Sequence, residues 1–128
     1  MTSKKGKIIP NGVILKPHEL RTVVFLTEQG YDVELIPKVD KEGVRTPDIK
    51  INNLKWEMKS PKGAGRYLIQ NTIQKAIKQS HNIIIDLRRA KRPQEKCLRE
   101  TKTELEKSKS LRRLKIITKK GVMLDFEK

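Results

Sequence analysis

Polar and apolar residues alternate strictly between positions 47 and 59, on either side of the pair Asn52-Asn53. A period of two is typical of a half-buried strand, and an Asn pair suits a tight two-residue turn. The pattern therefore predicts a β-hairpin in which Asp48 lies directly opposite Glu57. The apolar residues of this hairpin share the other face and are expected in the core; they are Ile49, Ile51, Leu54, Trp56 and Met58.

A helix and a strand are predicted ahead of this hairpin. Pro17 suits the first turn of a helix, and Gly30 is typical of the position that closes one. The apolar face of this helix is expected to carry Leu20, Val23 and Val24. Residues 31–36 favour a strand that ends near Pro37.

Further elements follow the hairpin. Apolar residues at helical spacing predict an amphipathic helix, with Ile69, Ile73, Ala76 and Ile77 on one face and Gln70, Gln74 and Lys78 on the other. Residues 82–87 are apolar on both faces, as in a central strand covered by helices. Residues 93–110 predict a largely exposed helix, and residues 114–117 and 122–126 predict a final hairpin. The predicted fold class is mixed α/β, with a central mixed sheet flanked by helices in the order α-β-β-β-α-β-α-β-β.

The length of 128 residues is sufficient for one domain, which we place at residues 17–128. Residues 1–16 lack strong periodicity and predict a basic arm that either lies over the domain or moves freely. No apolar stretch approaches the roughly 20 residues of a membrane helix, so no membrane association is expected, and no signal peptide is visible in this chain. The single cysteine, Cys97, cannot form an internal disulfide.

The charge of the chain indicates its partner. There are 30 Lys and Arg against 15 Asp and Glu, which gives a net charge of +15 and makes nucleic acid the expected partner. A solubilising surface or a ribosomal type of scaffold protein is the alternative. Aromatic residues make up only 4%, so recognition by shape and charge is expected rather than base stacking. A folded RNA such as tRNA fits this better than an unstructured strand.

The predicted hairpin brings together residues that suit phosphodiester chemistry. Directly paired residues have Cβ atoms about 4.5–5.5 Å apart, close enough for Asp48 and Glu57 to hold one divalent cation. Lys59 lies two residues beyond Glu57 and projects from the same face. In the alternative interpretation the two carboxylates are neutralised by Lys50, Lys55 and Lys59, in surface ion pairs that each contribute about 0–1 kcal/mol.

The wider pattern resembles a known superfamily. Pro47-Asp48 followed by Glu57-Met58-Lys59 resembles the PD-(D/E)XK nuclease motif, and the order of elements around it resembles the restriction-endonuclease-like core. The segments 46–48, 56–63 and 72–80 resemble more closely the C-terminal tRNA-nuclease domain of contact-dependent growth-inhibition (CdiA-type) toxins.

These resemblances imply roles for individual residues. Asp48 and Glu57 would bind Mg²⁺, with Mn²⁺ or Zn²⁺ as alternatives, and Lys59 would assist the attacking water. Glu19 would be the additional acidic residue and Gln74 the polar helix residue near the site, although Glu19 also suits the start of a helix, whose dipole it complements. Nucleic acid would contact Lys62, Arg66 and Lys78.

Other polar residues have plainer interpretations. His18 and His81 are typical of surface positions, and Gln74 is also typical of a solvated helix face. Asp86 stands within an apolar run, where we expect it to anchor a hydrogen-bond network.

The resemblance implies a metal-dependent endonuclease that cleaves tRNA as a bacterial toxin-like domain in the cytoplasm of a target cell. An acidic immunity protein is then expected as a partner. Two alternatives remain open at this point: a DNA endonuclease of a mobile element, and a non-catalytic basic module that binds nucleic acid. The sequence does not indicate the oligomeric state.

Overall fold

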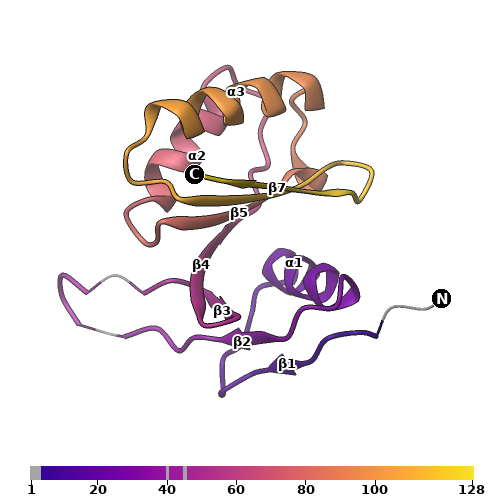
Figure 1. The fold of residues 1–128 in the computed structure, drawn as a ribbon, viewed down its shortest axis with the longest axis vertical. Helices are drawn as coiled ribbons and strands as arrows, with labels where there is room; N and C mark the ends of the chain where they lie inside the picture. Colours follow the sequence, from indigo (N-terminus) through magenta and orange to yellow (C-terminus); the bar gives the residue numbers. More distant parts are fainter. Residues whose placement is uncertain (1–3, 40, 45) are drawn as a thin grey trace.

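One seven-stranded mixed sheet runs through the molecule in a computed structural model that describes residues 4–39, 41–44 and 46–128 (Figure 1). In chain order the elements are β1 (Ile8–Ile9), α1 (Pro17–Glu28), β2 (Val33–Leu35), β3 (Ile49–Ile51), β4 (Leu54–Lys59), α2 (Leu68–Ala76), β5 (Asn82–Asp86), the 3₁₀-helix η1 (Leu87–Arg89), α3 (Gln94–Lys107), β6 (Arg113–Ile117) and β7 (Met123–Glu127). The strands follow one another across the sheet in this same order. Those pairing in parallel are β1 with β2, β4 with β5, and β5 with β6. The predicted mixed α/β class and element order are confirmed, with β1 in addition.

The central hairpin has the predicted turn. Asn52 and Asn53 have φ angles of 50° and 66°, and Ile51 pairs with Leu54 across the turn. The regular ladder ends at the pair Ile49 and Trp56. One residue earlier, the Asp48 N–H donates to the Trp56 carbonyl at 3.0 Å, so the backbone departs from the direct opposition to Glu57 that strict alternation predicted.

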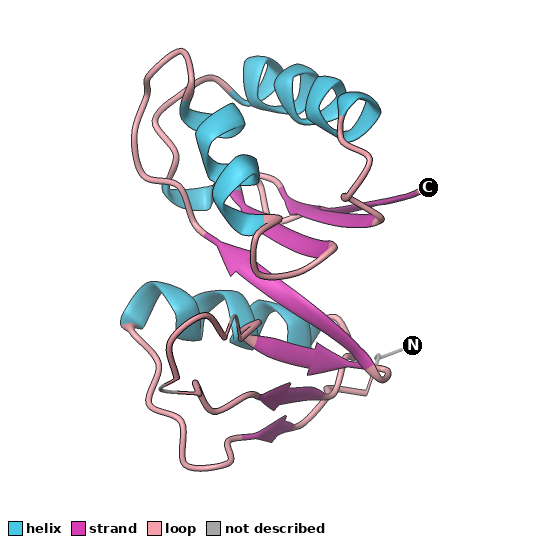
Figure 2. Ribbon diagram, turned by 90° about the vertical axis from the view of Figure 1, so that its left-hand side faces the viewer, coloured by secondary structure: helices cyan, strands magenta, loops and turns pink. Residues whose placement is uncertain are grey.

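Two hydrophobic clusters cover the two faces of the sheet. One joins α1 to the apolar face of the hairpin and includes Val23, Leu26, Trp56 and Met58. The other joins α2 and α3 to β5 and β6 and includes Ile69, Ile73 and Cys97. Figure 2 shows β4 crossing between the group formed by β1, β2, β3 and α1 and the group formed by β5, β6, β7, α2 and α3. The end of β4 therefore lies where helices from both groups can reach it.

The helix α1 buries a different face from the one predicted. Thr22, Val23, Phe25 and Leu26 are buried, whereas Leu20 and Val24 are 46% and 40% exposed. At 100° per residue, positions 20 and 24 lie opposite the stripe centred on 22 and 26, so they point away from the sheet. Gly30, with φ of 97°, follows the helix as expected.

The remaining predicted elements are confirmed. Ile69, Ile73 and Ala76 of α2 are buried, and all five residues of β5 are buried. Helix α3 is mostly exposed and buries Cys97, Thr101 and Glu104.

The segment ahead of α1 contributes a strand that the sequence did not indicate. Ile8 and Ile9 are exposed, yet they pair in parallel with Val33 and Glu34 of β2. Two residues are too short a run to show a period of two, so no pattern marks this strand. No helix in the described ranges is long and apolar enough to cross a membrane.

Candidate active site

The largest cavity opens between the start of α1, the end of β4 and one face of α2. It has a volume of about 500 Å³. Its walls are formed by Lys16, His18, Glu19, Thr22, Asp48, Glu57, Met58, Lys59, Ser60, Pro61, Leu68, Asn71, Thr72 and Lys75. Four predicted site residues, Glu19, Asp48, Glu57 and Lys59, therefore lie in one cavity although they come from three parts of the chain.

Asp48 is held in place by two contacts. Its Oδ2 accepts a hydrogen bond from the Met58 backbone N–H at 2.8 Å, which ties it to β4 beside Glu57. Its Oδ1 accepts from Lys38 Nζ, also at 2.8 Å, and Lys38 donates in addition to the Thr46 carbonyl at 2.9 Å. Both carboxylate oxygens are thus satisfied.

Lys38 is a residue that the sequence analysis missed. It follows β2 in a loop, where no alternation indicates the direction of a side chain. The alternative interpretation assigned Lys50, Lys55 and Lys59 to the acidic pair. Of these, Lys59 lies 3.5 Å from Glu57, whereas Lys50 and Lys55 face each other across the hairpin. The nearest signal for Lys38 is its place directly after Pro37, where the strand was predicted to end.

Glu57 is the most perturbed acidic residue of the cavity. It is 5% exposed, its Oε1 has no hydrogen-bond partner within the described residues, and Lys59 Nζ lies 3.5 Å from Oε2. Burial raises the pKa of Glu57 to about 7, and the neighbouring carboxyl group of Asp48 adds to this rise, whereas Lys59 and Lys38 oppose it. The two lysines therefore do not fully offset the cost of ionising the buried Glu57 beside Asp48.

The arrangement fits a hard divalent cation with oxygen ligands. Asp48 and Glu57 lie together, and the unsatisfied Oε1 of Glu57 is a buried acceptor that a cation would neutralise. No cluster of three or more His, Cys, Asp or Glu side chains suitable for a metal occurs in the part of the chain described. Mg²⁺ suits such a site because it is commonly bound by one or two carboxylates together with water and phosphate oxygens.

Replacing Glu57 by glutamine is expected to stabilise the protein at high pH. Because the fold raises the pKa of Glu57 from 4.5 to about 7, its ionisation costs stability as the pH rises through that window. Glu57→Gln removes this cost, so the free energy of unfolding should increase by about 3 kcal/mol near pH 8. Near pH 4, where both states are protonated, it should change little. Urea unfolding with EDTA at both pH values measures this, and equal changes at the two values would contradict it.

Glu19 takes part in a helix cap. Its side chain accepts from the Lys16 N–H at 2.9 Å, in the second half of a capping box at the start of α1. The same side chain lines the cavity. Its position therefore accommodates both the capping role and the acidic role expected from the resemblance.

The phase of α2 places other residues at the cavity than the sequence indicated. Asn71, Thr72 and Lys75 line it, whereas Gln74 is exposed and lies outside its walls. At about 100° per residue, Gln74 points about 100° away from Lys75 and about 160° away from Thr72, so it lies off the face that α2 presents to the cavity.

The predicted nucleic-acid contacts lie around the cavity and not within it. Lys62 is exposed in the loop after β4. Arg66 lies over the Tyr67 ring at 5.6 Å and lines a cavity towards α3, and Lys78 lines another beside the hairpin turn.

The histidines and Asp86 differ in their surroundings. His81 Nδ1 lies 2.8 Å from the Ser110 carbonyl, which gives it a structural contact, while His18 lines the candidate site. The hydrogen-bond network expected at Asp86 is present and connects to Thr22 and Arg88.

Comparison with known proteins defines the family. The sequence profile of the contact-dependent growth inhibition CdiA C-terminal domain matches residues 45–123, more than half of the chain. The protein belongs to this family of toxin domains. In three dimensions it is similar to a chain of the CdiA-CT/CdiI toxin and immunity complex from Burkholderia pseudomallei, with a TM-score of 0.70 and 18% identity over 96% of this chain and 100% of that one. At this identity the likeness shows the fold alone. No curated protein matches in sequence.

Proposed function

We propose that this toxin domain is a metal-dependent endonuclease of the PD-(D/E)XK type, with a restriction-endonuclease-like core, that cleaves phosphodiester bonds in tRNA. One observation carries the proposal: a buried carboxylate with an unsatisfied oxygen, Glu57, lies beside a second carboxylate, Asp48, with Lys59 at 3.5 Å. An isolated surface ion pair would not require the carboxylate to be buried, and burial without a partner is costly.

Each residue has a separate role in this proposal. Asp48 and Glu57 would hold a divalent cation, whose positive charge would stabilise the negative charge that builds on the phosphate oxygens. Lys59, whose side chain is 32% exposed, is open enough to reach the phosphate and shielded enough to act strongly on it. Lys59 binds a phosphate oxygen or orients the attacking water. Glu19, which also lines the cavity, is the additional acidic residue of the site.

The substrate is bound by the surface around the cavity. Lys75 brings a further positive charge from α2 into the cavity itself. Lys62, Arg66, Gln74 and Lys78 would contact the nucleic acid outside it. Each lysine or arginine that neutralises a phosphate adds to the salt dependence of binding.

The proposal includes a partner and a place of action. An acidic immunity protein would cover the strongly basic surface, since the chain carries a net charge of +15. The toxin would act in the cytoplasm of a target cell, where its RNA substrate is found.

Incubation with total bacterial tRNA and with plasmid DNA, each with Mg²⁺, Mn²⁺ or EDTA, tests the function. Cleavage of tRNA that needs the cation and stops with EDTA is the expected result. Cutting of the plasmid alone would replace tRNA by DNA as the substrate. Tight, salt-sensitive binding of both without cutting would leave a non-catalytic module and overturn the nuclease assignment.

A further inference from the structure

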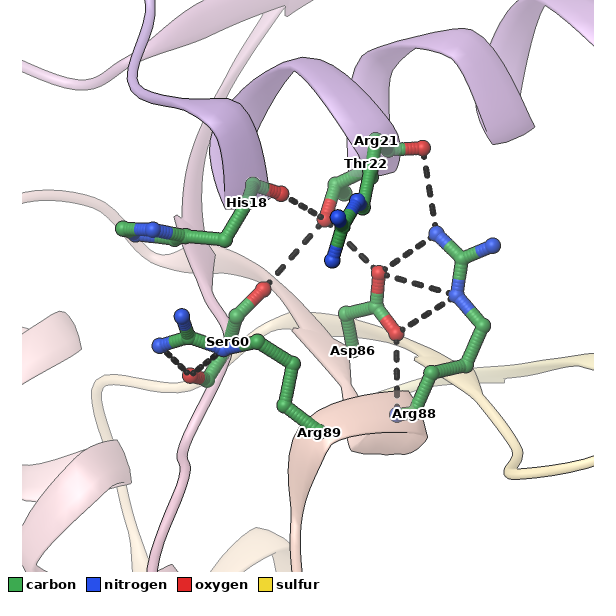
Figure 3. A network of polar contacts seen from close by, with 7 residues as sticks. All are labelled: His18, Arg21, Thr22, Ser60, Asp86, Arg88 and Arg89. Carbon is green, nitrogen blue, oxygen red and sulfur yellow. Dashed lines mark hydrogen bonds and ion pairs between the residues drawn. The ribbon is translucent and has the colours of Figure 1, made fainter.

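A second, smaller cavity adjoins the candidate active site. It has a volume of about 200 Å³ and is lined by six residues, His18, Arg21, Ser60, Asp86, Arg88 and Arg89 (Figure 3). We call it the arginine pocket. His18 and Ser60 line both cavities, so the two cavities adjoin.

The carboxylate of the arginine pocket is already occupied. Asp86 is 3% exposed and accepts a hydrogen bond from Thr22 Oγ1 at 2.7 Å. It also accepts from Arg88 Nη2 at 2.8 Å and from the Arg88 backbone N–H at 3.1 Å. Arg88 therefore neutralises the negative charge of Asp86. The positive charges of Arg21 and Arg89 are not neutralised by this carboxylate.

Arg88 and Arg89 are held in position by hydrogen bonds while part of each guanidinium stays available. Arg88 Nη2 donates to the Arg21 carbonyl at 3.0 Å, and Arg89 donates to the Ser60 carbonyl from Nε at 3.3 Å and from Nη2 at 2.9 Å. Within the described residues, Nη1 of Arg88, Nη1 of Arg89 and the whole guanidinium of Arg21 have no hydrogen-bond partner. Fixed guanidinium groups with unused N–H donors are well suited to a phosphate, whose oxygens they can bind two at a time.

The size of the pocket restricts what it can hold. Sites for whole small ligands occupy roughly 300–1,000 Å³, so a cavity of about 200 Å³ fits a phosphate group without its base. The lining residues include no Phe, Tyr or Trp, and the imidazole of His18 is the one aromatic ring among the six, so the surface on which a base could stack is small.

We infer that the arginine pocket binds one phosphate of the nucleic-acid strand, next along the backbone to the phosphate in the candidate active site. This rests on the proposed function, because it assigns the neighbouring cavity to the bond that is cut. The contact fixes the register of the strand: with one phosphate held by Arg21 and Arg89, the next is delivered to Lys59.

The test measures binding separately from cleavage. In a Glu57→Gln chain, the side-chain Nε–Hε signals of Arg21, Arg88 and Arg89 are followed by NMR during titration with inorganic phosphate and then with a short RNA strand. Saturable shifts of these signals are expected with both probes. Arg21→Gln should weaken RNA binding roughly five- to tenfold and lower the slope of log K against log salt by about 0.7, the value for one phosphate contact on a single strand. Arg21→Lys keeps the positive charge but loses the two parallel N–H donors of the guanidinium. Its affinity for RNA should therefore lie between those of the unaltered chain and Arg21→Gln.

Arg99→Gln is the matched control, since Arg99 is an exposed helix arginine on α3 that lines neither cavity. Equal effects of Arg21→Gln and Arg99→Gln would reduce the pocket to general surface charge and overturn the inference. Arginine shifts that appear only with an acidic protein and not with phosphate or RNA would also overturn it. If the pocket binds phosphate but no cleavage occurs with any cation, the proposed function fails and the binding site stands. If cleavage occurs and Arg21→Gln changes neither binding nor salt slope, the inference alone fails.

Discussion

Glu57→Gln is expected to lower cation-dependent cleavage at least about a hundredfold, and Asp48→Asn by a similar factor. Each substitution replaces a charged oxygen ligand by an amide of the same shape, so the cation is held less tightly while the side chain still fills its place. The rate of cleavage of the preferred substrate, measured with saturating Mg²⁺ or Mn²⁺, gives the factor. Thermal unfolding with and without the cation gives a second readout, since the cation should raise the Tm of the unaltered chain more than that of either variant.

Glu106→Gln provides the matched control. It makes the same chemical change at an exposed position of α3, away from the cavity. Because both changes remove one negative charge from a basic chain, both should leave binding of nucleic acid unchanged or slightly tighter. A Glu57→Gln protein that cleaves at the rate of the Glu106→Gln protein would remove Glu57 from the active site.

Asp86→Ala is expected to destabilise the fold by about 3–5 kcal/mol, because it removes the buried carboxylate that neutralises Arg88 and accepts from the Thr22 hydroxyl. Burial alone would raise the pKa of Asp86, but the hydrogen bonds from Arg88 and Thr22 outweigh it and hold the pKa below its ordinary value of 3.8. The stabilising effect of Asp86 is therefore present above that pH and is lost as the pH falls further. Urea unfolding near pH 7 measures the loss.

Glu127→Ala is the comparison for Asp86. Glu127 also pairs with an arginine, Arg113 at 3.3 Å, but its side chain is 66% exposed. Its removal should cost no more than about 1 kcal/mol. Similar losses for the two substitutions would show that the network at Asp86 contributes nothing beyond an ordinary surface pair.

The central hairpin could be predicted because one period explains all of its residues. Alternation from residue 47 to 59 places five apolar side chains on one face, and a shift by one residue would expose all of them. The positions of Glu57 and Lys59 follow directly from that constraint. Asp48 lies at the end of the ladder, where the constraint weakens, and its backbone departs from the expected pairing although its carboxyl group still meets Glu57.

The rest of the site depends on tertiary contacts that no local period encodes. The sequence indicates the rotation of α2 only through its apolar residues. These residues define the buried face of the helix, but they do not determine which polar residues beside that face line the cavity. Lys75 lines it and Gln74 does not. The arginine pocket joins residues from α1, the position after β4, the end of β5 and η1, and its outermost members, His18 and Arg89, are 71 positions apart in the chain. Lys38 comes from a loop, where neither the two-residue period of a strand nor the 3.6-residue period of a helix applies.

Lys38 has a consequence for how ligands would assemble in the cavity. It donates to Asp48 Oδ1, so a cation that bound this oxygen would have to displace the ammonium group. Such competition is reciprocal: the ion pair would lower the affinity for the cation by the same factor by which the bound cation weakens the ion pair. The ammonium group would then serve as the counter-ion of Asp48 until a cation takes its place.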